Sequence, residues 1–339
     1  MKNASQNQPT PPKARDIRAQ WHQHAVRPGD RRRDIWMGRL ITTVAISTIA
    51  AIILIFLFIG REAAPVLTSS EVHQEVTVSK MVVPLESRPG KPKMFLWQPV
   101  SGTPKYSLPP LILGSLKATL VAILFAAPFA IGAAVYSSEF APPRIREIIK
   151  PIVEMLAGIP SVVMGFFALM VLASALKDTF GWKFRLNATN AGIALGVAII
   201  PVIYTVAEGA LRAVPRQFRE AAQALGASPW ATARRVILPA AAPGIFAGVA
   251  LGFGRAIGET MIVLMASGNA AIWSLSLTDS IRTMSATIAA ELAEVVNGSA
   301  HYHVLFFIGA LLFLLTFLIN SLGELYVGRL RRRLTGVAG

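Results

Sequence analysis

Six long stretches of apolar residues constrain this sequence more than any other feature. They cover roughly residues 38–60, 109–136, 152–176, 189–211, 240–266 and 304–327. Residues 40–59 contain no charged side chain, and residues 304–326 contain only Glu324. Because a helix needs about 20 mostly apolar residues to cross the hydrocarbon core of a bilayer, each stretch can span a membrane. The sequence predicts an all-α integral membrane protein with six transmembrane helices.

The net charge is consistent with that prediction. The chain carries 33 Lys and Arg against 18 Asp and Glu, a formal charge of +15, which could indicate a nucleic-acid-binding protein. Only 15% of its 339 residues are charged, however, whereas a soluble domain has about 25%. The chain contains no cysteine, which excludes a disulfide scaffold, a Cys-ligated zinc site and thiol catalysis.

The distribution of Lys and Arg predicts the orientation. Residues 1–39, 137–151, 212–239 and 328–339 hold 9, 3, 5 and 4 of them, 21 in all, whereas the alternate connections hold 10. Basic residues collect in cytoplasmic loops, so both termini are predicted to be cytoplasmic, in a multi-pass protein of the cell (inner) membrane.

Five segments follow from this topology. They are a polar cytoplasmic extension (1–37), the first span (38–60), an external segment (61–108), a five-helix core (109–327) that includes a cytoplasmic loop (212–239), and a basic cytoplasmic tail (328–339). Alternating Val and Thr at 76–83 favour extended structure in the external segment.

The most specific local pattern lies in the 212–239 loop. It reads EAAQALG at 220–226, then nine residues, then VILP at 236–239. We expect a helix rich in small residues, ended by Gly226, and a second short helix that returns to the membrane. Ala221 and Ala222 would allow close approach of another protein, and Glu220 offers it a charge. A plain helix–turn–helix connector is an equal alternative.

Two ionisable residues, Arg255 and Glu259, lie within the fifth apolar stretch. Four residues apart on one helix, they would share a face. Charged side chains inside a bilayer are costly unless they are paired or line a cavity, and they often mark a substrate path. Arg is well shaped to grip an oxyanion through two hydrogen bonds, and Glu259 could hold it when no substrate is bound. A purely structural ion pair is the alternative.

Several of these segments resemble one family. The 220–239 pattern resembles the EAA loop found in permease subunits of binding-protein-dependent ABC importers, with Val236 in place of Ile. GRAIGETM at 254–261 followed by Gly268-Asn269, and AGIPSVVMGFF at 157–167, are similar to phosphate importer permeases of the PstC type. The resemblance covers about 94–327. It does not extend to the polar N-terminal extension or to the extra length at 64–93.

The resemblance implies a function for each group of residues. It implies the type I ABC importer architecture and transport of inorganic phosphate, with Arg255 and Glu259 on the anion path. Glu220, Ala221, Ala222 and Gly226 would dock on a separate ATP-binding subunit dimer. The other expected partners are a second permease subunit, an external phosphate-binding protein and membrane lipid, but no nucleic acid. We expect no cofactor or metal on this chain itself, because ATP is used by the partner ATPase.

Gly244, Gly248 and Gly252 form a stripe of small residues at four-residue spacing, which lets two membrane helices approach closely. The stripe predicts either an interface with the second permease subunit or an internal contact with the third or fourth span.

Two other interpretations of the function stay open. The transported anion could be sulfate, molybdate or another oxyanion, or the chain could be a non-transporting anchor or signalling subunit. No phosphate-binding GxxxxGK[ST] loop and no catalytic Ser/His/Asp set occur, so we expect no enzyme activity in the chain itself.

Overall fold

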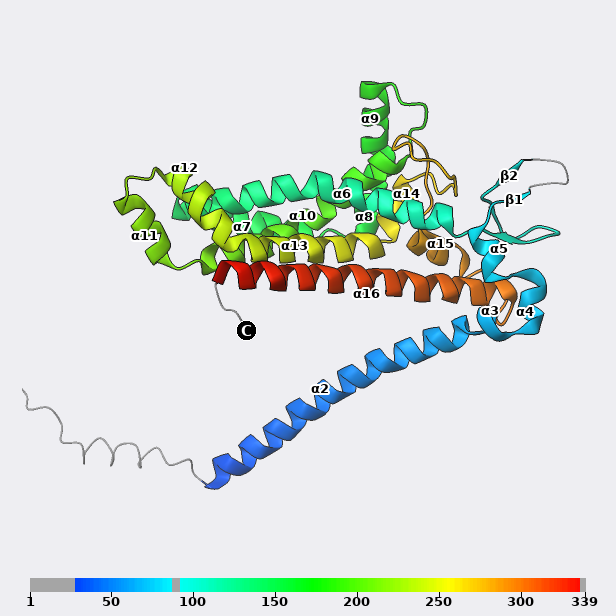
Figure 1. The fold of residues 1–339 in the computed structure, drawn as a ribbon, viewed down its shortest axis with the longest axis horizontal. Coiled ribbons are helices and arrows are strands. Elements are labelled where there is room, and N and C mark those ends of the chain that lie inside the picture. Colours follow the sequence, from blue (N-terminus) through cyan, green and yellow to red (C-terminus); the bar gives the residue numbers. More distant parts are fainter. Residues whose placement is uncertain (1–27, 87–91, 336–339) are drawn as a thin grey trace, which may run out of the picture. The chain divides into compact units, whose positions relative to one another are not determined.

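The computed structural model describes residues 28–86 and 92–335 (Figure 1). Among them are six helices long and apolar enough to cross a membrane: Arg33–Thr68, Pro109–Phe140, Ser161–Phe180, Ala188–Ala213, Pro229–Gly258 and Ala300–Arg329. The prediction of six spanning helices is confirmed. Most of the predicted polar extension (1–37) and the end of the predicted tail (328–339) lie outside the described residues.

The chain divides into two units, Met1–Phe58 and Ile59–Gly339. The described part of the first unit belongs to the 36-residue helix α2 (Pro28–Ala63), and every side chain from 33 to 58 is exposed. All the remaining elements belong to the second unit. The first span therefore contributes no buried side chain of its own over residues 33–58.

The segment between the long helices α2 and α6 (Pro109–Val135) is built from short elements. They are α3 (Pro65–Thr68), α4 (Ser70–Glu75), α5 (Val78–Val82) and two antiparallel strand pairs, β1 (Leu85–Glu86) with β2 (Lys93–Met94) and β3 (Trp97–Gln98) with β4 (Lys105–Tyr106). The extended structure predicted for 76–83 is wrong, because residues 78–82 are helical. Val76 and Met81 instead bury their side chains in a core shared with the start of α16 (Ala300–Thr335).

Helices α6 (Pro109–Val135), α10 (Ala188–Ala213) and α13 (Leu238–Gly258) form the centre of the second unit, with α16 alongside α13 (Figure 1). Five alanines at four-residue spacing line α6, namely Ala118, Ala122, Ala126, Ala130 and Ala134, and all are buried. On α10, Gly192 and Gly196 lie against Val121 and Phe125 of α6. Side chains this small let the two backbones approach closely, as membrane helices do when dispersion forces hold them together.

The third span begins later than the sequence predicts. Residues 143–157 form a separate helix, α7 (Pro143–Ala157), which has no buried side chain. The chain turns at Gly158–Pro160, and α8 (Ser161–Phe167), η2 (Ala168–Leu172) and α9 (Ala173–Phe180) then cross as one rod. The predicted bounds of 152–176 are therefore wrong. Pro160 is the N-cap residue of α8 and takes non-helical angles (φ −59°, ψ 138°), as the residue at the start of a helix typically does.

The fifth span also departs from its predicted bounds of 240–266. The chain leaves α10 through α11 (Arg216–Ala224), and α12 (Pro229–Thr232) and η3 (Ala233–Ile237) lead into α13. Helix α13 ends at Gly258, and a separate short helix, α14 (Met261–Ala266), follows. A loop and α15 (Met284–Glu291) then connect α14 to the last span.

The glycine stripe of α13 faces its own chain. A Cβ atom at Gly248 would lie 3.1 Å from Val206 Cβ, and one at Gly252 would lie 2.7 Å from Ile203 Cγ1; Gly244 lies against Ala210. All three neighbours belong to α10, the fourth span. The predicted interface with a second permease subunit is therefore not made by these glycines, and the internal alternative describes them.

The seam between α6 and α10 can be tested with two glycines that differ only in their surroundings. A Cβ at Gly192 would lie 2.5 Å from Val121 Cβ, whereas nothing lies within 4 Å of one at Gly132 of α6. We expect Gly192→Ala to lower the free energy of unfolding by about 1–3 kcal/mol through overpacking. Gly132→Ala should be neutral or mildly stabilising, since Ala favours helix. Thermal unfolding in detergent measures both; equal melting temperatures would contradict the close seam.

Candidate functional site

The fifth span breaks where the two ionisable residues lie. Glu259 follows the last residue of α13 and takes extended angles (φ −67°, ψ 135°). Its carboxylate Oε1 accepts a hydrogen bond from the backbone N–H of Thr260 at 3.1 Å, and its carbonyl accepts one from Ser285 Oγ at 2.8 Å. The polar backbone groups at the break are thus satisfied by local partners, as non-helical backbone inside a membrane protein requires.

The break lies at about mid-depth of the helix bundle. Gly252 packs on Ile203 in the central part of α10, and Gly254 lies next to Asn320, well inside α16. Arg255 is exposed in the last turn of α13, where a positive charge is favoured by the helix dipole. An exposed guanidinium at this depth requires water or protein beside it, because contact with lipid tails is too costly.

The structure corrects the predicted arrangement of this pair. Arg255 and Glu259 do not share a helical face, because the helix ends between them at Gly258. Among the ion pairs formed by the described residues, none joins the two side chains. The sequence pattern failed here because the apolar run continues through α14, which hides a helix break of only two residues.

The short helix α14 is held by α8. A Cβ atom at Gly165 of α8 would lie 3.0 Å from the carbonyl oxygen of Met261 and 3.2 Å from Ile262 Cα. Gly165 therefore lets the third span pack directly on the residues that follow the break. Two broken or shortened spans meet at this point, an arrangement that transporters commonly use for substrate sites.

The 212–239 loop forms the two helices that its pattern predicts. Helix α11 ends at Ala224, and Gly226 takes a left-handed conformation (φ 80°) that lets Ala227 N–H reach the carbonyl of Ala222 at 3.1 Å. This glycine-dependent turn closes the helix. The second helix, α12, begins at Pro229, and the Ser228 side chain accepts a hydrogen bond from Ala231 N–H.

One surface of this loop is apolar. Phe218, Leu225 and Trp230 are 50%, 89% and 58% exposed. Glu220 and Ala221 are exposed beside them, whereas Ala222 is buried against its own chain. Ala222 therefore does not present a small side chain to another protein as predicted. Large apolar side chains that are this exposed, outside the membrane-spanning helices, indicate a surface that another protein covers.

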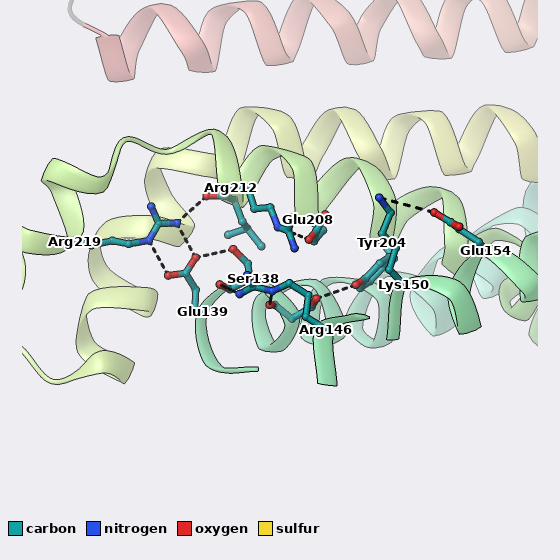
Figure 2. A network of polar contacts seen from close by, with 11 residues as sticks. Ser138, Glu139, Arg146, Lys150, Glu154, Tyr204, Glu208, Arg212 and Arg219 are labelled. Carbon is teal, nitrogen blue, oxygen red and sulfur yellow. Dashed lines mark hydrogen bonds and ion pairs between the residues drawn. The ribbon is translucent and has the colours of Figure 1, made fainter. Parts of the chain in front are cut away.

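A cleft of about 520 Å³ opens beside α11. We call it the arginine cleft, and its lining residues are Ser138, Arg146, Arg212, Arg216, Arg219, Glu220 and Gln223. Figure 2 shows the polar network around it. Arg212 pairs with Glu208 of its own helix at 2.5 Å. The cleft is therefore lined by charges that are partly neutralised within the chain.

The strongest ion pair of the network joins Arg219 to Glu139. Arg219 Nε lies 3.0 Å from Glu139 Oε2, and Nη2 lies 2.8 Å from Oε1, so the contact is bidentate (Figure 2). The hydrogen bonds to this carboxylate raise the pKa of the Arg219 guanidinium above its ordinary value, against the opposing effect of burial. Nothing in the sequence singled out Glu139, because a charged residue at the end of an apolar helix is ordinary.

A second polar cluster surrounds Glu291 at the end of α15. Its carboxylate accepts hydrogen bonds from Trp97 Nε1 at 2.9 Å, pairs with Arg282 at 2.6 Å and lies 2.9 Å from His301 Nε2. Burial favours the neutral acid, but the hydrogen bonds from His301 and Trp97 and the charge of Arg282 outweigh it, so the pKa of Glu291 lies below its ordinary value. The cluster ties the β3–β4 hairpin, α15 and the start of α16 together.

Among the described residues, no three His, Asp or Glu side chains converge in a way that could hold a metal ion.

Comparison with known proteins identifies the family. Residues 126–335 match the family described as binding-protein-dependent transport system inner membrane component. The chain belongs to this family. Its members are transport permeases rather than enzymes, and the six spans make this member a multi-pass membrane protein.

Similar sequences come from several bacteria. The probable ABC transporter permease protein YqgH of Bacillus subtilis is 33% identical over 85% of this chain and 89% of its own length. The phosphate transport system permease protein PstC of Mesorhizobium japonicum is 34% identical over 70% of this chain and 77% of its own. PstC 1 of Mycobacterium tuberculosis is 34% identical over 67% and 74%.

Solved structures agree in fold. A bacterial ABC transporter involved in import of the acidic polysaccharide alginate superposes with a TM-score of 0.59 at 16% identity, covering 88% of this chain and 98% of that one. The MetNI methionine ABC transporter gives a TM-score of 0.51 at 21% identity, over 64% and 93%. The architecture is that of type I ABC importer permeases, as the sequence predicts.

The Glu291 cluster makes stability depend on pH. Glu291→Gln leaves Arg282 without its counter-charge, which we expect to cost about 3 kcal/mol. The pKa of Glu291 is lower in the folded protein than in the unfolded chain. The extra stability of the wild type over Glu291→Gln should therefore be fully present above about pH 4.3, the ordinary pKa of Glu. It should be lost as the pH falls from there through the lower pKa of the folded state. Melting temperatures from pH 7 to 3 measure this.

The matched control is Glu147→Gln, a change of an exposed carboxylate on α7. Its melting temperature should follow that of the wild type at every pH. A difference between wild type and Glu291→Gln that stays constant down to pH 3 would contradict the assignment of Glu291 as a depressed, ionised carboxylate.

Proposed function

We propose that this chain is the transmembrane permease subunit of an ATP-driven importer of inorganic phosphate. The substrate assignment is supported by the PstC proteins, which align over about two thirds or more of both chains at 30–34% identity. The family match over residues 126–335 covers the broken span and the 212–239 loop.

The observation that carries the transport site is the exposure of Arg255 at the break in the fifth span. A guanidinium there can bind a phosphate oxyanion through two charge-assisted hydrogen bonds. Contact with the anion would be transient, since conduction requires binding weak enough to release. Glu259, held by its own hydrogen bond to Thr260 N–H, would border the path and disfavour a second anion.

The partners follow from the surfaces. The apolar residues of the 212–239 loop, with Glu220 and Ala221 beside them, would dock on a separate ATP-binding subunit dimer, which hydrolyses the ATP. A second permease subunit would complete the path beside Arg255, and an external binding protein would deliver phosphate. This chain would bind no cofactor itself. The chain would lie in a bacterial inner membrane, and its termini and the arginine cleft would face the cytoplasm.

The transport assignment is tested by uptake of radiolabelled phosphate into cells that lack the chain and into cells that carry variants. Deletion should abolish the uptake that depends on this system. Arg255→Gln should lower phosphate uptake by about 10–100-fold, which corresponds to the loss of one charge-assisted hydrogen bond. Membrane protein level is measured in parallel.

The control is Arg185→Gln, which removes an exposed arginine whose Nη1 donates only to Ser174 Oγ among its described contacts. This variant should transport like wild type. Unchanged uptake in the deletion strain would refute phosphate transport, and competition of the uptake by sulfate or molybdate would assign another oxyanion. Normal uptake by Arg255→Gln would remove this residue from the path.

The docking surface is tested by co-purification. Glu220→Ala combined with Gly226→Val removes the exposed charge and forces a β-branched residue into a left-handed conformation that only glycine adopts easily. We expect the ATP-binding subunit to be lost from the purified complex while the two permease subunits stay together. Full retention of the ATP-binding subunit would contradict docking at this loop.

A further inference from the structure

Helix α11 is weakly held by apolar packing. It has nine residues, and Ala222 is the one buried side chain among them. A helix this short is only marginally stable by itself. Its position relative to the membrane-spanning helices must therefore depend on polar contacts, and Arg219 makes the largest set of them.

Arg219 connects three separate elements. Besides the bidentate pair with Glu139, its Nη1 donates to the carbonyl of Val214 at 2.7 Å and its Nη2 donates to the carbonyl of Leu211 at 3.0 Å. These carbonyls lie at the end of α10, and Glu139 lies in η1 at the end of α6. A single guanidinium thus ties α11 to the ends of two spans. The side chains of Arg219 and Glu139 are 23% and 10% exposed, so the pair is mostly shielded from water.

The carboxylate end of this contact is anchored from behind. Ser138 Oγ donates to Glu139 Oε1 at 2.7 Å, and Arg146 of α7 donates to the carbonyls of Ser137 and Ser138 at 2.8 and 3.0 Å. Tyr204 of α10 donates to Ser137 Oγ at 3.0 Å (Figure 2). These hydrogen bonds fix the residues around Glu139 to both α7 and α10. Glu139 therefore cannot move independently of those two helices.

The segment that bears Glu139 is a π-helical turn. Ala141 N–H bonds to the carbonyl of Tyr136 at 2.8 Å, a five-residue spacing that widens the helix at the end of α6. Such turns are rare and occur frequently at functional sites. A force applied to Glu139 would reach α6 through this turn, and α6 packs along α10 for most of its length.

We propose that Arg219 and Glu139 are positioning residues that form a strut between the ATPase-docking helix and the second span. When the ATP-binding subunits move α11, the strut carries the movement into α6 and, through the α6–α10 seam, to the break in the fifth span. The role rests on the proposed function, because it requires that α11 be the element the ATPase moves. Without the strut, the complex would still hydrolyse ATP but would transport less phosphate for each ATP.

The chain's lack of cysteine permits a direct test of a mechanical role. Glu139→Cys and Arg219→Cys are combined in the complete transporter complex, reconstituted in liposomes with the external binding protein. Phosphate uptake and ATP hydrolysis are measured on the same sample, as is the stimulation of ATP hydrolysis by the binding protein. A thiol cross-linker about as long as an Arg–Glu contact then joins the two cysteines.

We expect the double variant to assemble and to hydrolyse ATP. The phosphate taken up per ATP hydrolysed should be at least about fivefold lower than in the wild type, which is the lower end of the range typical of coupling between two sites. The cross-linker should restore the ratio by a similar factor. A monofunctional thiol reagent should not, and neither should the cross-linker applied to either single-cysteine variant. Restoration by a covalent link is a result that a purely electrostatic role would not give, and unchanged assembly and ATP hydrolysis in the double variant distinguish the strut from a role in folding.

Two further variants make the test independent of the cysteine substitutions. Glu139→Gln keeps the size of the side chain and should lower uptake per ATP. Because it leaves Arg219 without its counter-charge, it should also lower the melting temperature, so uptake and ATP hydrolysis are compared only in complexes that assemble. Glu154→Gln is the matched control, since Glu154 pairs with Lys150 of the same helix, with both side chains 64% exposed. Its ratio should equal that of the wild type.

The strut is overturned if Glu139→Gln keeps the wild-type ratio, or if the cross-linked double variant recovers nothing. If the wild-type complex takes up no phosphate, the proposed substrate is wrong, and the strut is judged from the stimulation of ATP hydrolysis by the binding protein. Stimulation that is equal in wild type and Glu139→Gln would then overturn the strut separately.

Discussion

The close contact between α6 and α10 is the interaction on which the rest of the structure depends. Lipid tails are as apolar as the helices, so no hydrophobic effect drives α6 and α10 together. The contact depends instead on side chains small enough to let the two backbones approach closely. The alanine stripe of α6 and two glycines of α10 provide such surfaces. The glycines of α13 extend the same packing to a third helix, and the resulting frame holds both the broken span and the loop at its end.

The bilayer also explains why the break in the fifth span is so short. Every exposed N–H or C=O at membrane depth needs a partner, so a break is tolerated only where a few local groups can satisfy it. At Glu259 these are its own carboxylate and Ser285 Oγ. The break leaves Arg255 exposed on one side of it, as the proposed anion path requires.

The sequence determined the number of spans and the two-helix loop, because hydropathy over 20 residues and a Gly-ended helix are local properties. It did not determine where the third span begins or where the fifth span is broken. The apolar composition continues from the end of α7 into α8 and from α13 into α14, so hydropathy does not mark either boundary. The Arg219–Glu139 contact joins residues 80 positions apart, so no periodicity could indicate it. The glycine stripe was recognised as a packing surface, but its partner, α10, could only be found in three dimensions.

The exposed side chains of Phe218, Leu225 and Trp230 have a consequence for how a cell must make this protein. A subunit that is synthesised in excess of the protein covering them would present an apolar surface to water, where it would bind other copies of itself or be recognised by proteases and chaperones. If the proposed ATP-binding subunit covers these side chains, the amount of this chain in the membrane is expected to follow the supply of that subunit, so that assembly and quality control act through the same three side chains.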